Sequence, residues 1–198
     1  MKIFILTFNL PTIHERRVKD PKFVCWWILA CEGFLSSESK ESSARSAGHL
    51  NRSGTLIIVP CGKRKIWDVN PNAGPTIARL AYTGSLFNVN RAYAQKHADR
   101  WVVLSAKYGF IESDFTIPRN YDVSFGDERT GPIGVKELRR QVEDKGLNKF
   151  NRVVALGGKT YADIVDQAFS PFNMRVEKPF QGLSIGRMMS AVKKACQQ

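Results

Sequence analysis

Three short apolar runs of this sequence each end in residues that can do chemistry. The first run, residues 56–59, leads into Cys61 and three neighbouring cations, Lys63, Arg64 and Lys65. Nearby cations or partial burial lower the pKa of a lysine, which leaves part of its amine free to act as a nucleophile or base. The same cations favour a cysteine thiolate. Two interpretations stay open: a nucleophile in this segment, or a clamp for a phosphate or carboxylate.

The second run, residues 101–104, is followed at once by a hydroxyl, an amine, a phenol and a glycine: Ser105, Lys107, Tyr108 and Gly109. Further along, an aromatic residue lies between an amide and a carboxylate, in the order Asn120, Tyr121, Asp122. This combination can stack on a planar base and hydrogen-bond its edge. An ordered loop with Tyr121 packed on the core explains the same pattern.

The third run, residues 153–156, is followed by Gly157 and Gly158. Two glycines allow the backbone to approach a ligand, and the helix that follows could hold an anion with its first amides. Tight packing between strand and helix explains the glycines equally well. Neither this segment nor the one around Gly62 has the spacing of a phosphate loop or a dinucleotide fingerprint.

The elements that position these residues alternate between strand and helix patterns. Strands are expected near residues 55–60, 101–105, 152–156 and, more weakly, 173–177. Helices are expected at 76–82, 86–98, 135–145, 161–168 and 185–195. This pattern predicts a three-layer α/β/α sandwich with a mainly parallel sheet, whose strand ends form a shared ligand site. The connection 106–134 is too long for a turn and is expected to be functional or mobile.

The first part of the chain differs from the rest. Residues 1–53 combine short apolar patches with the Ser-rich stretch 36–43 and predict a poorly structured N-terminal extension, low-complexity or disordered in part. A small helix over 24–34 that docks on the main domain is the alternative. Residues 54–198 are expected to form a single α/β domain.

The composition indicates an anionic partner. The formal net charge of +12 and the pI near 9.8 favour nucleic acid, although a merely basic protein would look the same. The four cysteines show no CxxC pair and no histidine at ligand spacing, so we expect no metal, no disulfide framework and no cofactor, in a reducing cytoplasm. The apolar run 23–30 is too short to span a bilayer, and no membrane partner is expected.

Taken together, the motifs resemble an uncharacterised bacterial and phage domain family that reads PC-x-x-x-K, Y-x-G-x-x-F, W-x-x-LSA-K-YG and NYD across roughly residues 55–195. That family is distantly similar to peroxide-stress YaaA-type proteins and to the lyase-type domain of archaeosine synthase, near the uracil-DNA glycosylase-like α/β folds. In archaeosine synthase the lysine of this motif attacks a deazaguanine base, and the resemblance places that role on Lys65. Gly62 replaces a serine of that motif, so the resemblance implies nucleobase handling without specifying the reaction.

These observations predict a protein that handles a nucleobase or nucleic acid, as a base-modifying or lyase/glycosylase-like enzyme that uses Lys65. The candidate catalytic residues are Lys65, Cys61 and Ser105. The candidate substrate-binding residues, with Tyr82 and Ser85 supplied by the family motif, are Gly62, Lys63, Tyr82, Ser85, Lys107, Tyr108, Gly109, Asn120, Tyr121, Asp122, Gly157 and Gly158. The alternatives are a non-catalytic nucleic-acid-binding protein of a stress-response or phage-defence system, and a binder of free nucleotides.

Overall fold

The structure is a computed structural model that describes residues 53–197. Its strands are β1 (Thr55–Pro60), β2 (Thr76–Ile77), β3 (Arg100–Ser105), β4 (Gly109–Glu112), β5 (Thr116–Ile117), β6 (Arg152–Ala155) and β7 (Val176–Glu177). Its α-helices are α1 (Ala78–Ala81), α2 (Ser85–His97), α3 (Val135–Asp144), α4 (Lys159–Phe169) and α5 (Ile185–Gln197). Short 3₁₀ turns lie at Ile66–Asp68, Glu128–Thr130, Leu147–Lys149 and Ser170–Phe172.

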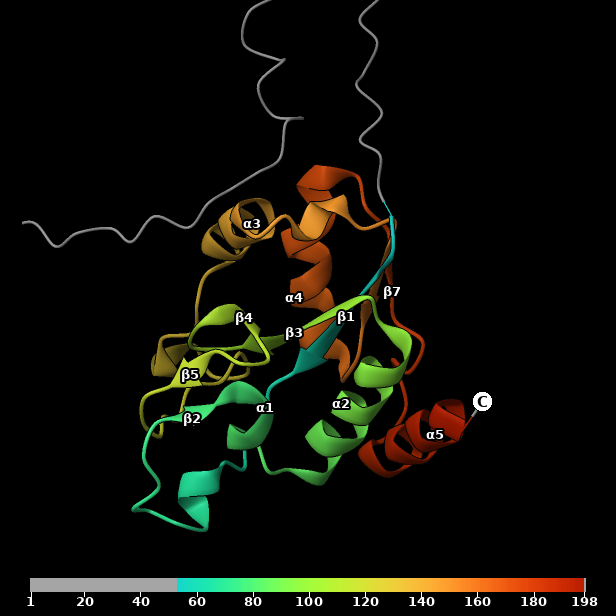
Figure 1. Ribbon diagram of the computed structural model, residues 1–198. Helices are drawn as coiled ribbons and strands as arrows, with labels where there is room; N and C mark the ends of the chain where they lie inside the picture. Colours follow the sequence, from blue (N-terminus) through green and yellow to red (C-terminus); the bar gives the residue numbers. More distant parts are fainter. Residues whose placement is uncertain (1–52, 198) are drawn as a thin grey trace, which may run out of the picture. The chain divides into compact units, whose positions relative to one another are not determined.

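The main sheet has the strand order β4-β3-β1-β6-β7. β1 pairs in parallel with β3 on one side and with β6 on the other, β7 pairs in parallel with β6, and β4 runs antiparallel to β3 at one edge. Helices α2 and α5 cover one face of this sheet and α3 and α4 cover the other (Figure 1). The expected three-layer α/β/α sandwich with a mainly parallel sheet is therefore confirmed.

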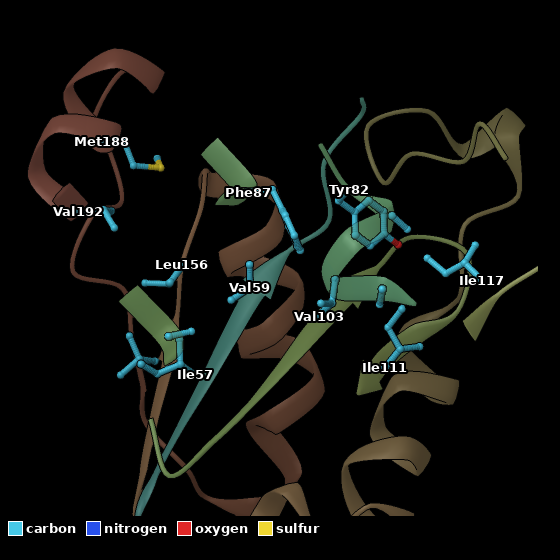
Figure 2. Close-up of a cluster of buried hydrophobic side chains, with 14 of the residues drawn as sticks. Ile57, Val59, Tyr82, Phe87, Val103, Ile111, Ile117, Leu156, Met188 and Val192 are labelled. Carbon is cyan, nitrogen blue, oxygen red and sulfur yellow. The ribbon is translucent and has the colours of Figure 1, made fainter. Parts of the chain in front are cut away.

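The residues of β1 divide between two hydrophobic cores because successive side chains of a strand point to opposite faces. Leu56 and Ile58 belong to the core under α3 and α4, and Ile57 and Val59 belong to the core under α2 and α5. Figure 2 shows the second of these cores, in which Phe87 lies beside Val59. A strand that is buried on both faces reads as a continuous apolar run, as this one does.

Most of the expected elements are confirmed, and three differ. The connection 106–134 contains β4 and β5, because Gly109, at φ +75°, allows the tight reversal that sends the chain back along β3. The helix expected at 76–82 is shorter, because its first two residues pair with β5. The strand expected at 173–177 is only β7, because Asn173 has a left-handed backbone with φ +50°.

Two expectations concern the N-terminal part and the membrane. The expected extension, residues 1–53, lies outside the described residues apart from Ser53. Across residues 53–197, no helix is long and apolar enough to cross a membrane.

A close packing contact fixes the ends of β1 and β6. Gly157 follows β6 with φ +108°, and a Cβ placed on it would lie 2.7 Å from Cγ of Pro60, the last residue of β1. Both the backbone conformation and the space therefore require glycine here. The tight-packing interpretation accounts for this glycine.

We predict that Gly157→Ala lowers the free energy of unfolding by roughly 1–3 kcal/mol, because the added methyl group meets the proline ring and the left-handed backbone disfavours alanine. Urea-induced unfolding followed by circular dichroism measures the change. Gly186→Ala is the matched control: Gly186 lies in α5 with nothing within 4 Å of the added Cβ, so this variant should be neutral or slightly more stable. Equal stability of the two variants would contradict the packing argument.

Candidate functional site

The strand ends meet at one edge of the sheet, as the parallel pairing requires. The backbone N–H of Cys61 donates to the carbonyl of Leu104 at 3.0 Å, which extends the pairing of β1 with β3 beyond Pro60. On the other side, the N–H of Leu156 donates to the carbonyl of Ile58 at 2.9 Å. Cys61 therefore lies between the residues that follow β3 and those that follow β6.

Lys65 is buried, with 5% of its surface exposed. Its backbone N–H donates to Asp68 Oδ2 at 2.8 Å, which caps the 3₁₀ turn, and its amine Nζ donates to the carbonyl of Lys63 at 3.1 Å. Nζ also lies over the ring of Tyr121, 4.5 Å from the centroid. Within residues 53–197, no carboxylate lies within 4 Å of this amine. The amine is therefore held by a carbonyl and an aromatic face.

Burial lowers the pKa of the Lys65 amine below the usual value for lysine, because desolvation disfavours the charged form. Cys61, Asp68 and Asp122 oppose this effect, and the positive charge of Lys63 adds to it. A lysine with a lowered pKa carries more of its neutral, nucleophilic form near neutral pH.

A cluster of buried hydroxyls lies behind the aromatic ring that Lys65 contacts. The Tyr121 hydroxyl is 2.5 Å from the Tyr82 hydroxyl and 2.8 Å from Ser105 Oγ. The backbone N–H groups of Lys107 and Tyr108 both donate to Ser105 Oγ at 3.2 Å, so the Ser105 proton is left to donate to Tyr121. The cluster fixes the position of the Tyr121 ring, and Ser105, with no exposed surface, acts on the site through Tyr121.

Cys61 lies against a tyrosine from α4. Its Sγ is 3.2 Å from the Tyr161 hydroxyl. Burial raises the pKa of the Cys61 thiol, and this outweighs the hydrogen bond from Tyr161 and the nearby charge of Lys65, which both lower it. The argument that neighbouring cations favour a thiolate therefore fails for Cys61, because desolvation is the larger effect. Burial likewise raises the pKa of Tyr161, so both groups are held in their protonated forms.

Two cavities open beside Lys65. The inner cavity has a volume of about 280 Å³, and the residues that line it are Cys61, Gly62, Lys63, Lys65, Tyr121, Asp122, Val123, Ser124, Asp127, Thr130 and Tyr161. The outer cavity has a volume of about 400 Å³, and its lining consists of Lys63, Lys65, Asp68, Asn120, Tyr121 and Asp122. Four residues line both cavities, so Lys65 and Tyr121 lie between them. Both volumes are of the order of small-molecule sites, roughly 300–1,000 Å³.

A larger hollow of about 730 Å³ lies between the starts of α3 and α4. Its lining includes Phe125, Gly134 and Lys159 but none of the candidate catalytic residues. The Phe125 ring meets the Tyr161 ring edge-on, with centroids 5.3 Å apart. This aromatic pair lies between the larger hollow and the inner cavity.

The structure brings most of the candidate residues together. The candidate residues that line the two cavities are Cys61, Gly62, Lys63, Lys65, Asn120, Tyr121 and Asp122. Tyr82 and Ser105 lie behind Tyr121, and Tyr108 meets the Tyr121 ring edge-on at 5.3 Å. Lys107 is exposed, with Nζ 5.3 Å from the Tyr121 centroid.

The remaining candidates line neither cavity. Ser85 is exposed at the start of α2. Gly109 is packed against the side chain of Gln141, and Gly157 against Pro60, so both have structural reasons to be glycine. Gly158 is the exposed N-cap of α4.

Several cavity residues were not among the candidates: Asp68, Val123, Ser124, Asp127, Thr130 and Tyr161. Tyr161 belongs to the segment that follows the third apolar run, and its place in the first turn of the helix was the available signal. Asp127 and Thr130 come from the connection 106–134, whose length indicated a functional role. No group of three or more metal-binding side chains occurs in residues 53–197.

The comparisons with known proteins identify the family. Residues 56–194 match a family of unknown function, DUF6884. The chain belongs to this family. The uncharacterized protein YfjM of Bacillus subtilis (strain 168) is 38% identical over 144 residues, which cover 72% of this chain and 95% of that protein. The expectation of an uncharacterised domain family is therefore confirmed.

The solved structures include one similar chain, in the crystal structure of AF0587, a protein of unknown function. It is 16% identical, with a TM-score of 0.35, and the match covers 73% of this chain and 44% of that one. This chain therefore spans less than half the length of that protein.

We predict that three of the five tyrosines ionise only at strongly alkaline pH. Burial raises the pKa of Tyr121 to about 12 and raises those of Tyr82 and Tyr161 further. Because an unfolded tyrosine ionises near pH 10, their contribution to stability is complete below about pH 10 and is lost as the pH rises towards the folded values. Phenolate absorbance against pH, with and without denaturant, measures this. Ionisation of all five near pH 10 in the folded protein would contradict it.

We also predict that the Lys65 amine titrates below the usual lysine range in the folded protein. Between the folded and unfolded pKa values, the amine is mostly neutral in the folded protein and mostly charged in the unfolded protein. This group therefore makes the free energy of unfolding rise with pH in that window. Carbon NMR of lysine Cε in labelled protein gives the midpoint, and Lys65→Arg assigns the signal. A Lys65 midpoint equal to that of a lysine in unfolded protein would exclude the desolvation effect.

Proposed function

We propose that this protein is an enzyme that acts on a nucleobase or nucleoside, with the Lys65 amine as its nucleophile. The observation that carries the proposal is a buried amine with a lowered pKa, free of carboxylate partners within 4 Å among the described residues, that lines two cavities. Desolvation disfavours the charged form of an amine, which is the form that binds an anion. An amine that forms a covalent bond gains from desolvation.

The chemistry available to such an amine is addition to an electrophilic carbon of a nucleoside. At the C1′ aldehyde of an abasic deoxyribose, the neutral amine forms a C–N bond, water leaves, and an imine results. At C1′ of an intact nucleoside, the new C–N bond would form as the glycosidic bond breaks, and the base would leave with the bonding electrons and take up a proton. Cys61 and Tyr161 are both held protonated, and because one of their two protons is used in the hydrogen bond between them, the other can be donated to a base in the inner cavity.

The polar groups around the cavities suit a heterocycle better than a simple anion. Asp122 presents acceptors, and the Ser124 hydroxyl, which accepts from the backbone N–H of Gly126, keeps a proton to donate. The Asp127 carboxylate is engaged by Arg129, and the Thr130 hydroxyl is engaged by backbone groups. A flipped base is read by hydrogen bonds to its edge and by contacts with its faces. This mixture of donors and acceptors supports a nucleobase as the ligand.

Two properties of the whole chain add support. The net charge of +12 favours a polyanionic substrate, so we place the nucleobase within nucleic acid. The motif resemblance to the lyase-type domain of archaeosine synthase points to the same lysine. A cytoplasmic location, expected from the cysteine pattern, is part of the proposal.

The test is covalent trapping with borohydride. The protein is incubated with single-stranded oligonucleotides that carry one abasic site, uracil, hypoxanthine or 8-oxoguanine, and borohydride is then added. We predict a borohydride-dependent adduct that Lys65→Ala abolishes, because reduction makes the imine permanent. Denaturing gels detect the adduct, and peptide mapping assigns it to Lys65.

Lys63→Ala is the matched control, because Lys63 lines the same cavities but is exposed and should not form the bond. Thermal unfolding of each variant shows whether it is folded. An adduct that survives in Lys65→Ala would refute the assignment of the nucleophile. Salt-sensitive binding of the oligonucleotides without any adduct or product would favour the non-catalytic nucleic-acid-binding alternative.

A further inference from the structure

The aromatic ring expected to stack on a base is already occupied by protein groups. Tyr121 is 9% exposed, and the amines of Lys65 and Lys107 lie 4.5 and 5.3 Å from its centroid. The Tyr108 ring meets it edge-on. Tyr121 can therefore form part of a cavity wall, but its face is not a free platform for a base.

The row of aromatic rings continues outward to one that is exposed. Tyr108 contacts Tyr121 on one side and Phe115 on the other, with the Tyr108 and Phe115 centroids 5.4 Å apart. Phe115 is 38% exposed. Three rings thus run from the buried amine of Lys65 to the protein surface.

Hydrogen bonds hold the backbone of the residue that carries the outermost ring, and the ring itself packs against Tyr108. The N–H of Phe115 donates to the carbonyl of Glu112 at 3.1 Å, and its own carbonyl accepts from the N–H of Ala78 at 2.8 Å. Phe115 therefore lies on a short connection between β4 and β5 that is fixed at both ends. A fixed, exposed aromatic ring loses little conformational freedom when a ligand stacks on it.

An exposed cation, Lys107, lies beside the aromatic row. The Lys107 amine lies 5.2 Å from the Tyr108 centroid and 5.3 Å from that of Tyr121. Lys63, Arg64, Lys107 and Arg119 are all exposed, and none forms an ion pair with a carboxylate in the described part of the chain. Aromatic rings interleaved with unpaired cations are the features that bind single strands, because bases stack on the rings and phosphates meet the cations.

We propose that the Phe115–Tyr108 edge is a docking surface for single-stranded nucleic acid, with a base stacked on Phe115 and a phosphate held by Lys107. This inference rests on the proposed function and names the form of its substrate: a strand whose neighbouring nucleotide lies on the aromatic row while one nucleotide enters the cavity beside Lys65. Free nucleosides would leave this surface unused.

The test compares two labelled probes that carry the same phosphates. One is an oligothymidylate of twelve nucleotides, and the other is a twelve-unit abasic phosphate polymer without bases. We predict that the protein binds the oligothymidylate about tenfold more tightly, because only this probe can stack. Fluorescence anisotropy measures both affinities, and duplex DNA of the same length is the third probe.

The variants separate stacking from charge. Phe115→Ala and Phe115→Leu should both remove the difference in affinity between the two single-stranded probes, whereas Phe115→Trp should keep this difference. Lys107→Gln should weaken the binding of both probes and reduce the slope of log affinity against log salt concentration by about 0.7. Leu183→Ala is the matched control, because Leu183 has the same 38% exposure and precedes α5.

Equal binding of the two single-stranded probes, tighter binding of the duplex, or an unchanged preference in Phe115→Ala would each overturn the inference. Its failure is distinguishable from failure of the proposed function. If borohydride trapping succeeds but the oligothymidylate shows no preference, Lys65 acts without this surface. If trapping fails but the Phe115-dependent preference holds, the surface binds single strands without the proposed chemistry.

Discussion

The pairing of β1 with parallel strands on both sides is the constraint on which the site depends. Its pairing with β6 ends at the bond between Leu156 N–H and the Ile58 carbonyl, because the next donor would be Pro60, which has no N–H. Its pairing with β3 continues for one more residue, to Cys61. The chain therefore leaves the sheet asymmetrically, held on the β3 side and free on the β6 side. The proline that ends the ladder is also the residue that packs on Gly157.

This exit carries Lys65 back into the protein. An antiparallel bridge joins the backbone of Lys65 to that of Tyr82. The Tyr82 hydroxyl contacts the Tyr121 hydroxyl, and the Tyr121 ring lies under the Lys65 amine. Ser105 completes the arrangement from the end of β3. Burying a lysine costs free energy unless its amine has partners, and here the Lys63 carbonyl and the aromatic face supply only part of what water would. The lowered pKa follows from that shortfall.

The sequence was sufficient to predict the sheet and much of the site, because both depend on local patterns. The apolar run 56–59 and the polar residues after it identify a buried strand and its carboxyl end without any knowledge of the fold. The antiparallel return of β4 was missed because a short hairpin depends on one left-handed glycine, Gly109, within an otherwise unremarkable connection. Tyr161 was missed because its role depends on where α4 lies over Cys61, which is a tertiary contact.

The same limit applies to the roles of individual residues. Proximity in sequence indicated that cations would favour a Cys61 thiolate, but only the burial of the thiol shows that desolvation is the larger effect. Tyr121 satisfied the pattern of a stacking residue, and the structure places its hydroxyl among other buried hydroxyls. Residue types thus predict which groups converge. Whether a group is protonated, and whether it is accessible to a ligand, depends on how it is packed.

The distribution of charge around the cavities also bears on the two interpretations of the cationic segment. A clamp for a phosphate would gather cations and exclude carboxylates, because like charges repel the ligand. Here Asp68 and Asp122 line the outer cavity together with Lys63 and Lys65. Lys65 is buried, and its burial lowers the pKa of its amine. Exposed cations remain available to phosphates at the rim, while the cavity itself offers acceptors beside an amine whose pKa is lowered. A ligand with an anionic backbone outside and a hydrogen-bonding heterocycle inside satisfies both regions, and a bare phosphate satisfies only the first.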